Sequence, residues 1–70
     1  MAEVRAELVS NVWKVLVAEG AAVAEGDALV ILESMKMEIP VLAEEGGTVT
    51  RVAVKEGDVI QAEDLIAVIG

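Results

Sequence analysis

The stretch ALVILESMKMEIPVLA, residues 28–43, decides the fold of this chain. Two aliphatic runs, residues 28–32 and 39–43, flank a hexapeptide that carries two carboxylates and one ammonium. Runs rich in leucine and β-branched residues, bounded by polar segments, are typical of strands. The hexapeptide cannot be buried whole, because burying unpaired charges is costly. The stretch therefore predicts a β-hairpin that holds Lys36 at its tip.

The composition limits what the chain can do. It has 70 residues, of which 56% are hydrophobic, and it contains neither Cys nor His. This length predicts one domain, residues 1–70, near the lower limit for an independently stable core. The missing residue types exclude disulfides, the usual zinc sites and imidazole catalysis. Many aliphatic residues favour a small barrel or sandwich, and we predict that the one aromatic residue, Trp13, covers an edge of its core or, alternatively, forms a contact patch.

The formal net charge is −8, from 13 acidic and five basic residues. Nucleic acids and anionic membranes attract basic patches, so this balance disfavours both as partners. No apolar run approaches the roughly 18 residues of a membrane span. The first nine residues contain three charged side chains, which a signal peptide would exclude. We therefore expect a cytoplasmic monomer whose acidic surface keeps it in solution or meets basic partners.

Short strands without helix are predicted for the rest of the chain. We expect strands at residues 4–9, 12–17, 48–54 and 65–69, and short bridges at 21–24 and 59–60. Turns are expected at the polar breaks, residues 10–11, 18–20, 25–27, 44–47, 56–58 and 62–64. The apolar residues of 12–17 do not alternate, which indicates a strand that bends or is covered on both sides. Pro40 cannot donate a backbone hydrogen bond, so its strand is assigned to a sheet edge.

An internal repeat relates the two halves of the chain. A shift of 37 residues places Glu19-Gly20 on Glu56-Gly57 and Asp27 on Asp64. The apolar positions stay in the same register, as in Val12 and Val49. Two similar halves of about four short strands each predict a pseudo-twofold all-β unit. The Lys36 tip then lies at one end of this unit, and the chain termini lie at the other.

The hexapeptide Glu33-Ser34-Met35-Lys36-Met37-Glu38 resembles the attachment motif of biotinyl domains, whose Met-Lys-Met core presents the lysine that biotin protein ligase modifies. The resemblance covers essentially the whole chain and includes Gly47-Thr48-Val49 and Gly57-Asp58. It implies a flattened β-barrel, or barrel-sandwich hybrid, of two four-stranded antiparallel sheets with pseudo-twofold symmetry. It also implies a biotin carboxyl carrier rather than an enzyme, with biotin attached covalently to Lys36. The implied partners are biotin protein ligase, biotin carboxylase and carboxyltransferase.

The resemblance also assigns roles around Lys36. Met35 and Met37 are expected to be flexible apolar contacts for the ligase, because thioethers adapt to a partner. Glu33, Ser34 and Glu38 are expected to frame the tip, and we hypothesise that the two carboxylates help the ligase to recognise it. The chain departs from the family pattern at several positions. Ser34 stands where alanine is common, and there is no insertion for the protruding thumb of some carriers. Residues 6–10 lack the family's Ala-Pro-Met-Pro-Gly run, and Glu63 stands where glycine is usual.

Two alternatives stay open. A lipoyl carrier on the same fold is disfavoured, because lipoyl domains typically place Asp before and Ala after the lysine, where this chain has Met35 and Met37. An unmodified β-domain that serves as a scaffold or interaction module is the other alternative. The three possibilities differ in the mass of the protein after exposure to a ligase.

Overall fold

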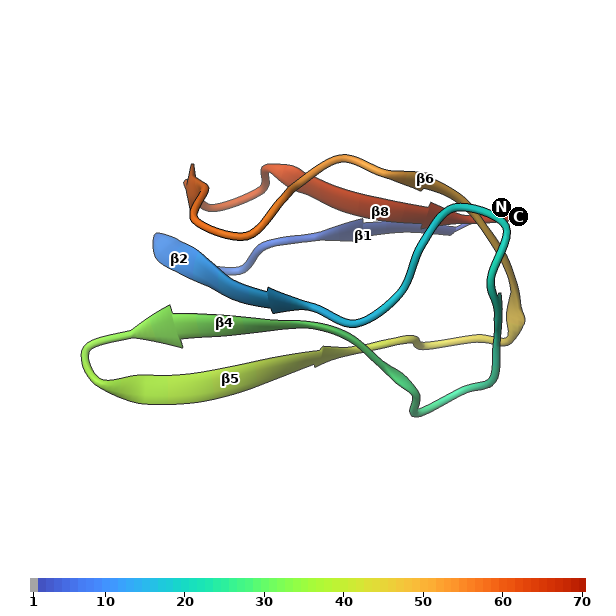
Figure 1. Cartoon of the computed structure of the whole chain (residues 1–70), viewed down its shortest axis with the longest axis horizontal. Coiled ribbons are helices and arrows are strands. Elements are labelled where there is room, and N and C mark those ends of the chain that lie inside the picture. The colour runs from blue at the N-terminus through green and yellow to red at the C-terminus, as the bar shows by residue number, and fades with distance from the viewer. Residues whose placement is uncertain (1) are drawn as a thin grey trace.

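Eight strands form two antiparallel sheets in residues 2–70, the part of the chain that the computed structural model describes (Figure 1). One sheet contains, in spatial order, β1 (Ala2–Arg5), β8 (Leu65–Ile69), β6 (Gly47–Val52) and β3 (Ala22–Val23). The other contains β5 (Met37–Leu42), β4 (Ala28–Ser34), β2 (Ser10–Val15) and β7 (Val59–Ile60). Residues 2–70 contain no helix. The predicted all-β architecture of two four-stranded sheets is confirmed.

The pseudo-twofold relation extends to single residues. A shift of 37 residues carries β1 onto the end of β5, β2 onto β6, β3 onto β7, and β4 onto β8. In β2 the pairing with β4 skips Trp13, and in β6 the pairing with β8 skips Thr50, which occupies the equivalent position. Each of these residues is the extra residue of a β-bulge. The bulge at Trp13 explains why the apolar residues of this segment do not alternate.

The loops of each half bind the strands of the other half. The backbone N–H of Gly20 donates to the carbonyl of Val49 at 2.7 Å, and that of Gly57 donates to the carbonyl of Val12 at 2.8 Å. Each pair of partners is the image of the other under the 37-residue shift. These exchanged hydrogen bonds hold the two sheets together at their loops, in addition to the apolar packing between them.

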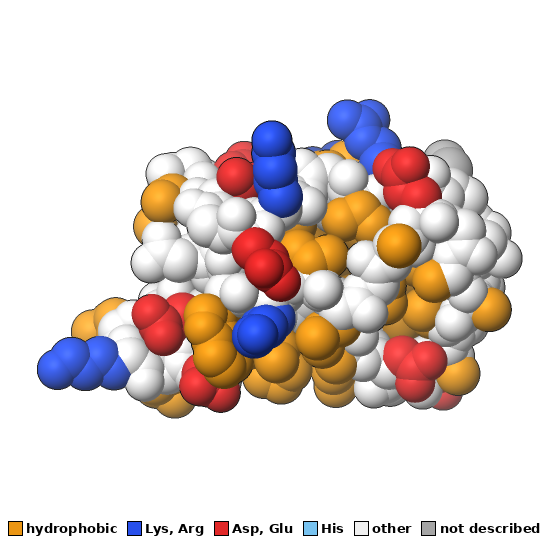
Figure 2. Space-filling model, viewed as in Figure 1, with side chains coloured by type: hydrophobic (Ala, Val, Ile, Leu, Met, Phe, Trp, Pro, Cys, Tyr) orange, Lys and Arg blue, Asp and Glu red, His pale blue; other side chains and the backbone are white. Residues whose placement is uncertain are grey.

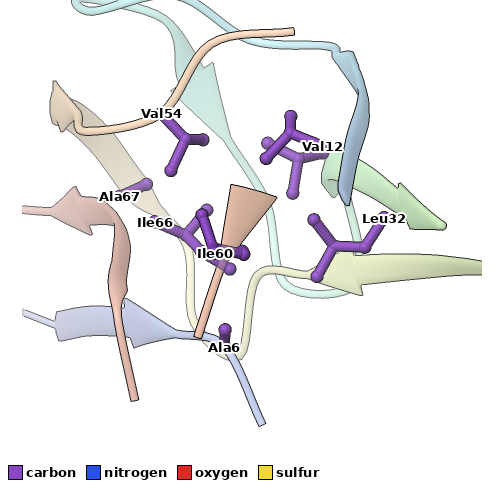
Figure 3. Packing of buried hydrophobic residues seen from close by; sticks show 8 residues of the cluster. Ala6, Val12, Leu32, Val54, Ile60, Ile66 and Ala67 are labelled. Atoms are coloured by element: carbon purple, nitrogen blue, oxygen red, sulfur yellow. The ribbon is translucent and has the colours of Figure 1, made fainter. Parts of the chain in front are cut away.

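The core lies between the two sheets. Figure 3 shows Val12 and Leu32 of one sheet facing Ile66 and Ala67 of the other, and all four are at most 4% exposed. A second cluster contains Leu29, Ala43 and Ile69. Burial of these aliphatic side chains is the main stabilising contribution available to a chain without disulfides.

Three local predictions were wrong. The strand expected at residues 4–9 ends at Arg5, because the chain leaves the first sheet after β1 and crosses to the second. The turn expected at Ser10-Asn11 lies inside β2, where these residues pair with Ile60 and Val59. Trp13 does not cover a core edge; it is 44% exposed, because the bulge turns it toward the outside of the sheet.

The two ends of the molecule differ as expected from the repeat. The β4–β5 hairpin forms one end, and both ends of the described chain lie at the opposite end (Figure 1). Ala2 of β1 pairs with Ile69 of β8, which places the ends of the described chain side by side. The first half thus continues into a hairpin at the position where the second half stops.

Candidate functional site

The β4–β5 hairpin ends in a turn of two residues. Ser34 and Met37 form its last cross-strand pair, so only Met35 and Lys36 lie between the strands. Both have positive φ, 52° and 66°, as in the type I′ turn that suits the twist of a hairpin. Residues with a Cβ rarely adopt this conformation, which costs about 1–3 kcal/mol each. The paired strands on either side hold Lys36 in a defined backbone position despite this cost.

The side chains of the turn project into solvent. Met35 is 92% exposed and Met37 is 65% exposed, so neither methionine packs back onto the core. Lys36 is exposed as well. The one ion pair found in residues 2–70 joins Arg5 to Glu3 at 2.9 Å, and Lys36 takes no part in it. The ε-amino group of Lys36 is therefore accessible to an enzyme that approaches this end of the molecule.

The predicted frame residues lie directly behind the turn. Glu33 and Glu38 are opposite each other in the β4–β5 register, and both are exposed. Like charges at opposite cross-strand positions are destabilising. Ser34 is half-buried, and its hydroxyl donates a hydrogen bond to the carbonyl of Val9 at 3.3 Å. This bond ties the end of β4 to the segment that precedes β2, and no spacing in the sequence indicates it.

Two other kinds of feature are absent from the described part of the chain. No cluster of His, Cys, Asp or Glu in residues 2–70 is suited to hold a metal ion. No helix within these residues is long and apolar enough to cross a membrane. A groove of about 330 Å³ separates the facing edges of β1 and β5 and is lined mainly by their side chains.

Among the exposed apolar residues outside the turn, sequence reasoning raised a contact patch only at Trp13 and missed the others. Large side chains of this kind lie in β2, β5 and β7 and in the segments before and after β2: Leu8, Val9, Trp13, Leu16, Leu42 and Val59. The signal was present in the internal repeat, because the equivalent positions of the other half hold small or polar residues.

Comparison with known proteins agrees with this geometry. The family model described as "Biotin-requiring enzyme" matches residues 2–69. The biotinylated protein TB7.3 homolog of Mycolicibacterium smegmatis is 70% identical over 67 residues, which cover 96% of this chain and 94% of that protein. The homolog of the same name from Mycobacterium leprae is 64% identical with the same coverage. Among solved structures, urea carboxylase of Kluyveromyces lactis superimposes with a TM-score of 0.92 and 38% identity, covering 99% of this chain but 6% of that protein.

Proposed function

This chain belongs to the biotin-requiring enzyme family, and on that premise we propose that it is a biotin carrier and that biotin is joined to the Nζ atom of Lys36. The observation that carries the assignment of the residue is the β4–β5 turn. It presents Lys36 on two residues of defined backbone conformation, with its side chain exposed. The amino group is then held near one position relative to the domain, because the backbone is fixed and only the lysine side chain rotates when a ligase binds.

The residues at the tip fit covalent attachment of biotin. Amide formation joins Nζ to the carboxyl carbon of biotin, with net loss of water that the ligase must drive. The ammonium charge disappears, so the formal charge changes from −8, with five bases against 13 acids, to −9, with four. Biotin, once attached, supplies the ureido nitrogen on which a carboxyl group is carried. The exposed thioethers of Met35 and Met37 offer the ligase an apolar contact on both sides of Lys36.

We propose biotin protein ligase, a biotin carboxylase and a carboxyltransferase as the partners. The carrier contributes attachment, reach and recognition, and we assign no catalytic residue to it. The carboxylase relatives support this role, since the Kluyveromyces lactis structure that it superimposes on is a urea carboxylase. Glu33 and Glu38 are proposed to help the ligase to recognise the tip, because the facing carboxylates lower stability and gain nothing inside the domain.

Intact mass after incubation with purified biotin protein ligase, biotin and ATP tests the proposal. We expect the mass of the parent chain to increase by one biotin, and the mass of Lys36→Arg to stay unchanged. Lys14→Arg and Lys55→Arg, which each remove one of the other two lysines, should still gain one biotin. Biotin on a chain that carries Lys36→Arg would refute the assignment of the residue. An increment of one lipoyl group after incubation with a lipoyl ligase, with none from the biotin ligase, would instead establish the lipoyl alternative. No increment from either ligase would leave a scaffold or interaction module.

A further inference from the structure

Exposed apolar side chains gather on the outer face of the sheet that carries the Lys36 turn. Within this sheet, exposed residues of β5 alternate with half-buried ones, so Glu38, Pro40 and Leu42 point away from the core. Exposed positions of β2 and β7 continue the same face. We call the following set the outer face: Trp13, Leu16, Pro40, Leu42 and Val59. Figure 2 shows hydrophobic side chains along the layer formed by β4 and β5.

The fold itself does not require an apolar outer face. The other sheet has the same strands, the same bulge and the same register, related by the 37-residue shift. Its residues at the five equivalent positions are Thr50, Ala53, Glu3, Arg5 and Ala22. All of these are exposed, and Arg5 and Glu3 form an ion pair there. Because one outer face folds with small and charged side chains, the shared architecture does not require the large apolar side chains of its counterpart.

Charge around the outer face indicates what it meets. Glu33 and Glu38 are exposed where this face borders the Lys36 turn, and Lys36 is the cation between them in sequence. The ammonium of Lys14 lies 5.5 Å from the centre of the Trp13 ring, a cation–π arrangement that covers part of this ring. The whole chain carries a charge of −8. A complementary surface is therefore apolar at its centre and basic where it approaches the Lys36 end.

We propose that the outer face is a docking surface for the biotin protein ligase, which binds it together with the Lys36 turn. This inference rests on the proposed function. The ligase acts on the unmodified chain, so it must select one lysine through protein contacts. Lys14 and Lys55 are exposed too and must be rejected.

The dimensions of the molecule suit a combined contact. The Cα extents are 31 × 17 × 17 Å. The cross-section of the end that carries the turn is therefore smaller than the roughly 800 Å² that each partner buries in a specific interface. Lys14, beside Trp13, pairs with Ile31, which is five residues before Lys36. At about 3.3 Å per residue the turn and this ring lie roughly 17 Å apart. One partner can cover both within an interface of ordinary size.

Steady-state biotinylation of the unmodified chain by a purified ligase tests the inference. The double variant Trp13→Thr with Leu16→Ala transplants the equivalent residues of the other face. We expect its KM to rise about tenfold or more, because a truncated interface Trp commonly loses that much affinity, with kcat within about twofold. Leu42→Arg, also a transplant, is expected to raise KM in the same way. The matched control is Thr50→Ala on the opposite face, and its KM should match that of the parent chain.

Binding without chemistry provides a second measurement. The Lys36→Arg chain should inhibit biotinylation of the parent chain competitively, and this inhibition should weaken about tenfold when Trp13→Thr and Leu16→Ala are added. Thermal unfolding of every variant checks that the fold is retained. Unchanged KM and inhibition constants for both face variants would overturn the inference while leaving Lys36 as the attachment residue. A parent chain that sediments as a dimer, and becomes a monomer on Trp13→Thr, would overturn it in favour of a second copy of the chain.

Discussion

Replacing Glu63 by glycine should stabilise the protein. Glu63 has φ of +71°, in the left-handed region, and its 37-residue equivalent is Gly26, with φ of +90°. The two turns are otherwise alike. The N–H of Glu63 donates to the carbonyl of Ala6 at 2.7 Å, and that of Gly26 donates to the carbonyl of Ala43 at 2.8 Å. The same left-handed backbone conformation is thus occupied by glycine at position 26 and by glutamate, which disfavours it, at position 63.

The expected gain is the difference between two opposing effects. A residue with a Cβ in the left-handed region costs about 1–2 kcal/mol relative to its ordinary conformation. Glycine makes the unfolded chain more flexible, which cancels about 0.4–1 kcal/mol of this gain. The guanidinium of Arg5 bonds to the backbone carbonyl of Glu63, at 3.0 Å, and this bond survives the substitution. The free energy of unfolding should therefore rise by about 0.5–1 kcal/mol, or about 3–6 °C in Tm.

Urea denaturation of four proteins separates the contributions. The parent chain and Glu63→Gly give the total effect, and Glu63→Gln removes the carboxylate from a chain of net charge −8 without changing the backbone. Gly26→Ala is the reciprocal test: an added Cβ there has no neighbour within 4 Å, so only its φ is unfavourable. We expect Gly26→Ala to lose about 0.5–1 kcal/mol. The reasoning fails if Glu63→Gly is no more stable than Glu63→Gln, or if Gly26→Ala is as stable as the parent.

Two further predictions concern close contacts and charge. Gly47→Ala should lower the free energy of unfolding by about 1–3 kcal/mol, because the added Cβ would lie 2.8 Å from the carbonyl oxygen of Gly70 and 2.9 Å from Cγ2 of Ile69. Urea denaturation measures this loss, and a stable Gly47→Ala protein would contradict the close packing. Glu38→Lys should raise the free energy of unfolding by about 0.2–1 kcal/mol, because the like-charge pair of Glu38 and Glu33 becomes a pair of opposite charges. That gain should shrink in about 1 M salt, and an equal gain at both salt concentrations would show that charge is not its cause.

The two ends of the pseudo-twofold fold differ in how the chain is connected. At one end β1 and β8 lie side by side without a turn between them, and at the other end the equivalent strands, β5 and β4, are joined into the Lys36 hairpin. The same architecture therefore brings the strands of the first sheet together at one end and exposes the side chain of Lys36 at the other. The positive φ of Met35 and Lys36 shows that the sequence of this turn is not optimised for stability.

Much of the architecture could be predicted from local sequence. Aliphatic runs separated by polar breaks predicted six of the eight strands close to their observed positions, and the 37-residue repeat predicted the symmetry. The hairpin with Lys36 at its tip was predicted from two aliphatic runs around a charged hexapeptide. These predictions succeeded because strand formation and solvent exposure of charges depend on side chains that are neighbours in the sequence.

Other features were decided by contacts between distant residues. Ser10 lies in a strand because it pairs with Ile60, and β1 ends where the N–H of Ala6 donates to the carbonyl of Asp64 at 2.9 Å. The bulge that exposes Trp13 depends on the register of β2 against β4. The sequence alone thus determined the strands, the symmetry and the candidate lysine. Only the tertiary structure decided where the chain changes sheets and which apolar side chains face solvent, because both follow from which backbone groups pair across the sheets.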